Sequence, residues 1–128
     1  MNFSAVENKC NEGIWINIDD VNGVQIEGVR IKILGIDSDA YKKKQRQITD
    51  KRINNRKMKI TSAELEAEGL SLITACVTAW EGIEDGEGAI ECTESNVRKF
   101  LSEQIYIKEQ LDTAIADRAN FIGNFKKD

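Results

Sequence analysis

Histidine and proline are both absent from the 128 residues of this chain. Without histidine, the commonest general base and the commonest metal ligand are missing. No Cys-x-x-Cys pair takes their place, so a structural zinc site is not expected. The three cysteines, Cys10, Cys76 and Cys92, lie far apart in the sequence. Together with an N-terminus that lacks a basic region followed by an apolar stretch, they predict free thiols in a reducing compartment.

Long apolar runs are also scarce. The longest, residues 70–80, covers about half of the ~20 residues that a membrane span needs, so no transmembrane helix is expected. A hydrophobic content of 41% and a net charge of −4 are typical of a globular protein. We expect a single domain over residues 1–128, in which residues 1–12 form a flexible N-terminus and residues 37–122 form a helical part.

Two short stretches near the N-terminus show the alternation of β-strands. Residues 14–18 read IWINI and residues 29–34 read VRIKIL, and both are rich in β-branched side chains. Between them, Asn22 and Gly23 are suited to the two positive φ angles of a type I′ turn. These features predict a β-hairpin over residues 14–34.

A two-residue loop at that turn defines the register of the hairpin. It places Ile14 opposite Ile31 on one face, and it brings Trp15 and Arg30 together on the other face, within reach of a cation–π contact. Gly28 interrupts the second strand, which indicates a bulge. Because a lone hairpin is marginally stable in water, its Ile/Val face must pack on another element.

Three capping signals mark helix starts in the helical part. Asp37, Ser38 and Asp39 precede a helix with few apolar residues. Thr61 and Glu64 form a capping box, and Ile60 and Leu65 a hydrophobic staple, at the start of a helix that we expect to run to about Trp80. Thr93 begins the next helix.

The remaining helical pattern runs through Ile107, Leu111, Ala114 and Ile115. Its spacing does not decide whether it joins the helix that begins at Thr93 as one bent helix or forms a second one. The fold expected from these signals is mainly α, with about four helices packed around a central apolar helix and a small N-terminal β-hairpin.

Charge is unevenly distributed along the chain. Residues 42–59 contain nine Lys or Arg and one acid, whereas residues 60–96 contain nine acids and no Lys or Arg. The acidic overall balance and the single flanking aromatic, Tyr41, argue against a nucleic-acid site and favour a solvated helix that balances its acidic neighbour. An acidic protein partner or a second copy also fits the charge. The face available to such a partner comprises Lys43, Lys44, Arg46, Lys51 and Arg52.

Catalytic and metal-binding arrangements are poorly supported. The acids around the glycines of residues 81–91 match no calcium-loop frame, and Glu81 with Glu84 is better explained as a solvated pair than as a catalytic one. Cys76 lies in an apolar helix, and Cys92, which precedes a helix start, is at most slightly activated. We therefore expect no enzymatic activity, no metal and no cofactor.

The stretch AWEGIEDGEGAIECTESNVRKFL, residues 79–101, resembles the tail assembly chaperones of long-tailed bacteriophages. Those proteins often show a Trp-x-Gly after the central helix, an acidic glycine turn, a Thr-x-x-Asn helix start, and a terminal amphipathic helix followed by Asn-Phe. Residues 28–47 are similar to the family's strand leading into a capped helix, and the resemblance covers most of residues 14–122. The matching positions here are Trp80, Gly82, Asp85, Gly88, Thr93, Asn96, Asn120 and Phe121.

The resemblance implies a non-enzymatic protein of the bacterial host cytoplasm. Such a phage or prophage protein solubilises the helical tape measure protein, recruits tail tube subunits and is absent from the mature virion. A chaperone of this kind needs a groove for an apolar helix. We place the candidate groove between the central and terminal helices, with Phe100, Leu111 and Ile115 as wall residues, although an intramolecular core is the commoner role for such side chains.

Three alternatives remain open at the level of sequence. The chain could instead be a small structural virion component, such as a tail completion or head–tail joining protein. It could be a nucleic-acid-associated protein that uses the basic helix of residues 42–59. Self-association through the hairpin edge or the last helix is compatible with each of these.

Overall fold

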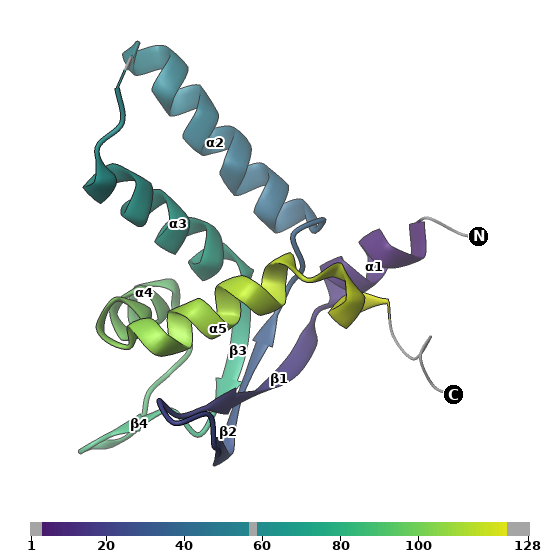
Figure 1. The fold of residues 1–128 in the computed structure, drawn as a ribbon, viewed down its shortest axis with the longest axis vertical. Coiled ribbons are helices and arrows are strands. Elements are labelled where there is room, and N and C mark those ends of the chain that lie inside the picture. The colour runs from purple at the N-terminus through teal and green to yellow at the C-terminus, as the bar shows by residue number, and fades with distance from the viewer. Residues whose placement is uncertain (1–3, 57–58, 123–128) are drawn as a thin grey trace.

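The computed structural model describes residues 4–56 and 59–122 and is shown in Figure 1. It is mainly α-helical, with a small antiparallel sheet formed largely by residues near the N-terminus. In chain order, the elements are α1 (Ser4–Glu12), β1 (Ile14–Asp19), β2 (Gln25–Ile33), α2 (Asp39–Asn55), α3 (Ser62–Cys76), β3 (Val77–Glu81), β4 (Glu84–Asp85), β5 (Gly88–Ala89), α4 (Glu94–Glu103), α5 (Ile105–Ala116) and the 3-10 helix η1 (Arg118–Phe121).

The hairpin of β1 and β2 is present, but its register differs from the expected one. Ile14 lies opposite Ile33 instead of Ile31, and Ile31 lies opposite Ile16. Between the Asp19–Gln25 and Asn17–Arg30 pairs, β2 has three more residues than β1, and with the changed loop pairing this leaves a shift of two residues from the expected register. The irregularity contains Gly28, whose φ of +81° is the left-handed conformation that suits glycine. Because the shift is even, the isoleucines of both strands still share the inner face.

The loop of this hairpin is longer than the predicted two residues. Asp20 and Val24 pair through the Asp20 N–H, which donates to the Val24 carbonyl at 2.8 Å. The Asp20 carboxylate accepts from the N–H groups of Asn22 and Val24 at 2.8 and 3.0 Å. Gly23 has a positive φ but Asn22 does not, so the type I′ assignment was wrong. The carboxylate of Asp20 favours a three-residue loop by satisfying backbone donors within it.

On the outer face of the hairpin, Trp15 and Arg30 meet as predicted. The Arg30 guanidinium carbon lies 4.6 Å from the centre of the Trp15 ring. Arg30 also donates to Glu81 on the third strand through Nε and Nη2, at 3.1 and 2.9 Å. One guanidinium therefore ties together side chains from all three strands of the sheet.

The helix that begins with the Thr61–Glu64 capping box ends at Cys76, four residues before the expected end at Trp80. Residues 77–81 instead form β3, which pairs antiparallel with β2. Ile31 lies opposite Trp80, so Trp80 belongs to the sheet. The exposed edge of β2 provides hydrogen-bond partners that a helix of residues 77–81 would leave unused, and this tertiary pairing outweighs the helical pattern.

The N-terminal segment is also more ordered than predicted. Residues 4–12 form α1, whereas residues 1–3 lie outside the described residues. Cys10 of α1 is fully buried, and its carbonyl accepts from the Gly35 N–H at 3.1 Å. A Cβ at Gly35 would approach the Cys10 Sγ within 2.3 Å, so this glycine permits the close contact.

The other two predicted helix starts are correct. The Ser38 hydroxyl accepts from the Tyr41 N–H at the start of α2, and Thr93 caps α4. Ile60 and Leu65, the expected staple pair, are both exposed.

Residues 105–116 form a separate helix, α5, because α4 ends at Glu103 and the chain changes direction at Gln104. The sequence had left this point open.

The core lies between the inner face of the sheet and the helices α3, α4 and α5. The sheet contributes Ile18, Ile31 and Ile33, and the C-terminal turns of α3 contribute Ile73 and Cys76. The helices α4 and α5 add a continuous row of buried side chains, comprising Val97, Leu101, Ile107, Leu111 and Ile115. Contacts of α3 extend to α2, α4 and α5. By contrast, α2 has no buried side chain and stands at one edge of the molecule (Figure 1).

Candidate partner-binding groove

The residues that carry the family resemblance have structural roles in this fold. Trp80 packs edge-to-face on Phe100, with ring centroids 5.5 Å apart. Its indole Nε1 donates to the Ile90 carbonyl at 2.8 Å, which attaches the connector after β3 to the sheet. Gly82 has a φ of +81°, and a Cβ there would lie 2.3 Å from the Gly28 carbonyl oxygen. Glycine is therefore required where the chain leaves β3 beside the bulge of β2.

The acidic connector after β3 contains the short hairpin of β4 and β5. The Asp85 carboxylate accepts from the Glu87 N–H at 2.7 Å in the turn, and Gly88 follows with a φ of +123°. Ile83, between β3 and β4, is buried.

The remaining resemblance positions organise the ends of helices. The Thr93 hydroxyl accepts from the Asn96 N–H at 3.2 Å, and Asn96 Nδ2 donates to the Glu91 carbonyl at 2.9 Å. Asn120 Nδ2 donates to the Ala114 carbonyl at 3.1 Å near the end of α5, and Phe121 is buried. None of these contacts forms a recess by itself.

The groove expected between the central and terminal helices is not open. Leu111 is 0% exposed and Ile115 is 2% exposed, so both are core residues and neither lines a surface. Phe100 is partly buried, and it borders a shallow depression with Ile26, Val29 and Tyr106. The helical faces of Leu111 and Ile115 are covered because the sheet supplies the opposite side of the core.

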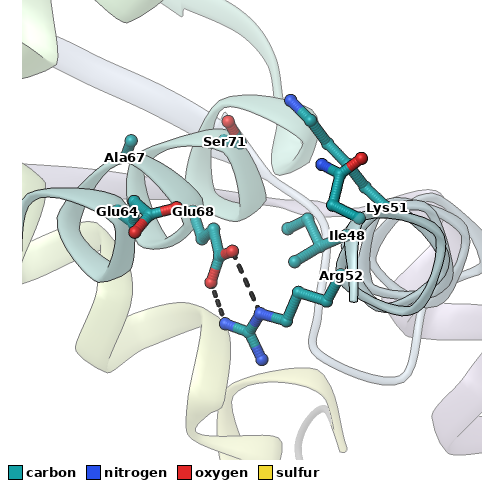
Figure 2. Close-up of a pocket in the computed structure, with 8 residues that line it drawn as sticks. Ile48, Lys51, Arg52, Glu64, Ala67, Glu68 and Ser71 are labelled. Atoms are coloured by element: carbon teal, nitrogen blue, oxygen red, sulfur yellow. Dashed lines mark hydrogen bonds and ion pairs between the residues drawn. The ribbon is translucent and has the colours of Figure 1, made fainter. Parts of the chain in front are cut away.

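A groove of about 240 Å³ does lie elsewhere, between α2 and α3. Figure 2 shows how Arg52 reaches from α2 to Glu68 on α3, with Ile48 beside it. Arg52 Nε donates to Glu68 at 3.2 Å, and a second hydrogen bond joins its Nη2 to the other carboxylate oxygen. This bidentate pair connects the two helices across the groove. The lining residues are Ile48, Lys51, Arg52, Asn55, Glu64, Ala67, Glu68 and Ser71.

Sequence reasoning placed Lys51 and Arg52 on a partner-binding face but missed the α3 side of this groove. The sequence did contain a signal for the α3 side of the groove. Tyr41 and Ile48 are seven residues apart, so they lie on one side of α2, and that side faces α3. Ala67 contributes little side-chain volume, and Ser71 is half-buried. Because Ala67 and Ser71 are small and α2 has no buried side chain, the space between α2 and α3 is not filled.

The basic residues of α2 are only partly neutralised within the chain. Lys42 pairs with Glu7 of α1 at 3.1 Å, and Arg52 pairs with Glu68. Lys43, Lys44, Arg46 and Lys51 form no ion pair with any residue in the ranges 4–56 and 59–122. We expected the acidic residues of the following segment to neutralise the basic helix. In the structure, Glu68 does so for Arg52 but not for the helix as a whole.

The three cysteines are free thiols, as predicted. Burial raises the pKa of the Cys76 thiol to about 12, and burial also raises the pKa of Cys10. Cys92 was predicted to be at most slightly activated, and burial raises the pKa of that thiol as well. Thiols with raised pKa values are poor nucleophiles.

Two further properties bear on the kind of site that the chain can hold. Within the described residues, no three Cys, Asp or Glu side chains come together in a way that would hold a metal ion. Among the helices of residues 4–56 and 59–122, none has the length and apolar character to cross a membrane. Comparison of the chain with protein-family models, curated proteins and solved structures finds no match.

Proposed function

We propose that this chain is a non-enzymatic tail assembly chaperone of a long-tailed bacteriophage or prophage. The observation that carries the proposal is the groove between α2 and α3, which is bordered by a helix with no buried side chain. The resemblance of residues 79–101 to that family supports the same function from a separate part of the chain. The proposed partner is the tape measure protein, whose apolar helical faces need cover before the tail assembles.

The groove suits one apolar seam of a partner helix. Ile48 of α2 and Ala67 of α3 both line the groove and provide apolar surface in it. Lys51 lies on the α2 side without an ion pair in the described residues, so it favours an acidic side chain on the partner. α2 contributes no fully buried side chain, and its contact with the core is the partly buried Tyr41 near its start. Movement of the C-terminal half of α2 would therefore widen the groove mainly at the cost of the Arg52–Glu68 pair.

The proposed place of action is the cytoplasm of the bacterial host. There the chain would hold the tape measure protein soluble while tail tube subunits are recruited, and it would leave before the virion matures. No nucleic acid, metal or cofactor is required for this activity. In the packing that we propose for the free chain, α3 is the central apolar helix. α2 is then the element that moves when the partner binds.

Co-expression with the tape measure protein, followed by affinity pull-down, tests the proposal. The wild-type chain is expected to co-purify with that protein and to keep it soluble. Ala67→Trp fills the groove and is expected to abolish co-purification. Glu66→Trp is the matched control, because Glu66 is exposed on α3 but does not line the groove.

The results distinguish the main alternative. If wild type does not co-purify and the chain is found in purified phage particles, it is a structural component such as a tail completion or head–tail joining protein. If Ala67→Trp and Glu66→Trp both co-purify as wild type does, the tape measure protein binds elsewhere on the chain. Circular dichroism of each variant establishes that it is folded.

A further inference from the structure

Opposite charges occupy opposite ends of this molecule. The basic helix α2 lies along one edge, and the hairpin of β4 and β5 projects at the far side, with α3 and α4 between them (Figure 1). Within one chain, the two charged regions do not meet. Screening at physiological ionic strength limits their mutual attraction to about 8 Å.

The first region is a basic arm, defined as Lys43, Lys44 and Arg46. These side chains belong to the N-terminal half of α2, and at about 100° per residue they share one half of the helix circumference. None of them forms an ion pair within the described residues, and none lines the groove between α2 and α3. The acids on α2 are Asp39 and Asp50, so the helix remains strongly positive.

The second region is an acidic hairpin, defined as Glu84, Asp85, Glu87 and Glu91. All four residues are exposed, and no ion pair joins them to the part of the chain that the structure describes. The neighbouring acids do have partners, since Glu81 pairs with Arg30 and Glu94 with Arg98. The acidic hairpin thus carries four exposed negative charges, against the three positive charges of the basic arm, of which Lys43 and Arg46 are exposed and Lys44 is half-buried.

We propose that copies of this chain associate head to tail, with the basic arm of one copy bound to the acidic hairpin of the next. A second copy is the fitting occupant because it carries the complementary charges in nearly equal number and is present at the same concentration. Such a heterologous contact leaves one basic arm and one acidic hairpin unused at the ends of each assembly, so further copies add in the same way. The contact is separate from the groove of the proposed function.

Sedimentation velocity of the full chain at several protein concentrations tests the association. In salt of about 0.01 M, the sedimentation coefficient is expected to rise with protein concentration. In salt of about 1 M, where charges are screened within about 3 Å, the chain is expected to sediment as a monomer. A monomer at low salt, or an assembly that persists at high salt, would overturn the proposal.

Charge reversal identifies the two surfaces. K43E/R46E and E84K/E87K are each expected to weaken association about tenfold or more, since each removes two pairs and introduces repulsion. The matched controls are K99E/K108E and E103K/E109K, which change the net charge equally at sites on α4 and α5. These controls are expected to associate as wild type does, and equal weakening in a control would contradict the assignment.

Mixing the two reversed variants provides a further test. K43E/R46E retains an acidic hairpin, and E84K/E87K retains a basic arm, so an equimolar mixture is expected to form complexes that neither variant forms alone. A mixture that remains monomeric would exclude contact between these two surfaces. None of the reversed residues lines the α2–α3 groove. Failure of the mixing experiment would therefore contradict self-association alone, and failure of the pull-down with the tape measure protein would contradict the proposed function alone.

Discussion

Gln110 on α5 hydrogen-bonds to the backbone of Asp19 with both ends of its side-chain amide. Its Oε1 accepts from the Asp19 N–H at 2.8 Å, and its Nε2 donates to the Asp19 carbonyl at 2.7 Å. The side chain thus takes the place of a neighbouring strand at the end of β1, which is an edge strand of the sheet. This contact both attaches α5 to the sheet and covers an edge that would otherwise be open to pairing.

Replacement of Gln110 by leucine is expected to lower the free energy of unfolding by about 2 kcal/mol, because two partly buried backbone groups lose their partners. Urea denaturation of the variant measures the loss. Gln47→Leu is the matched control, since Gln47 is exposed on α2 and forms no hydrogen bond within the described residues. Equal stability of the two variants would show that the Asp19 contact contributes little.

The glycine of the Trp-x-Gly motif is predicted to be needed for stability. Gly82→Ala introduces a Cβ close to the Gly28 carbonyl and forces alanine into a positive φ, so we expect a loss of about 2 kcal/mol or more. Thermal unfolding compares it with Gly86→Ala, where no atom lies within 4 Å of the added Cβ and φ is not positive. If the two variants unfold alike, the close approach at Gly82 does not matter.

A buried hydroxyl on α3 offers a route to higher stability. Thr74 is buried, and its Oγ1 has no hydrogen-bond partner among the described residues. Thr74→Val removes this unsatisfied group at nearly constant shape and is expected to raise the free energy of unfolding by about 1 kcal/mol. Thr113→Val, at an exposed position on α5, is expected to change little. Destabilisation by Thr74→Val would indicate that the hydroxyl has a partner.

The ion pair between Asp37 and Arg118 predicts a dependence of stability on pH. Arg118 Nε and Nη2 donate to the two Asp37 carboxylate oxygens at 2.6 and 2.9 Å. The hydrogen bond from Arg118 lowers the pKa of Asp37 below its ordinary value of 3.8. A folded-state pKa below the unfolded one gives stabilisation that is fully present above the unfolded pKa and is lost as pH falls through the folded pKa.

Urea denaturation of wild type and Asp37→Asn at several pH values checks this sign. Wild type is expected to be the more stable of the two near about pH 7, and the difference is expected to disappear near about pH 2. Asp50→Asn serves as the control, because Asp50 is exposed on α2 and forms no ion pair in the described part of the chain. A difference for Asp37→Asn that does not vary with pH would contradict the role of the charge.

Some features of the chain were predictable because their causes are local. Helix starts were predicted at residues 37–39, at Thr61 and at Thr93, and the structure confirms all three, with Ser38 as the cap of the first. Each start depends on a side chain and a backbone N–H three residues away. The contact of Trp15 with Arg30 was also predictable, because alternation along two strands decides which side chains share a face. The exact register was not, since the irregularity at Gly28 depends on contacts beyond the hairpin.

The candidate site was predictable only in part. Lys51 and Arg52 were expected on a partner-binding face, and both line the α2–α3 groove. Leu111 and Ile115 were expected at a groove wall because periodicity marks an apolar helical face without indicating what covers it. In this fold, the sheet covers that face, so both residues belong to the core.

The sequence by itself determined the helix caps, the inner and outer faces of the hairpin and the separation of basic from acidic segments, because each depends on residues close together in the chain. Only the tertiary structure decided that residues 77–81 form a strand. Their apolar pattern fits a helix equally well, and the choice depends on hydrogen bonds to β2, more than forty residues earlier in the chain. The groove likewise exists in neither helix alone, since it is the space that α2 and α3 leave between them.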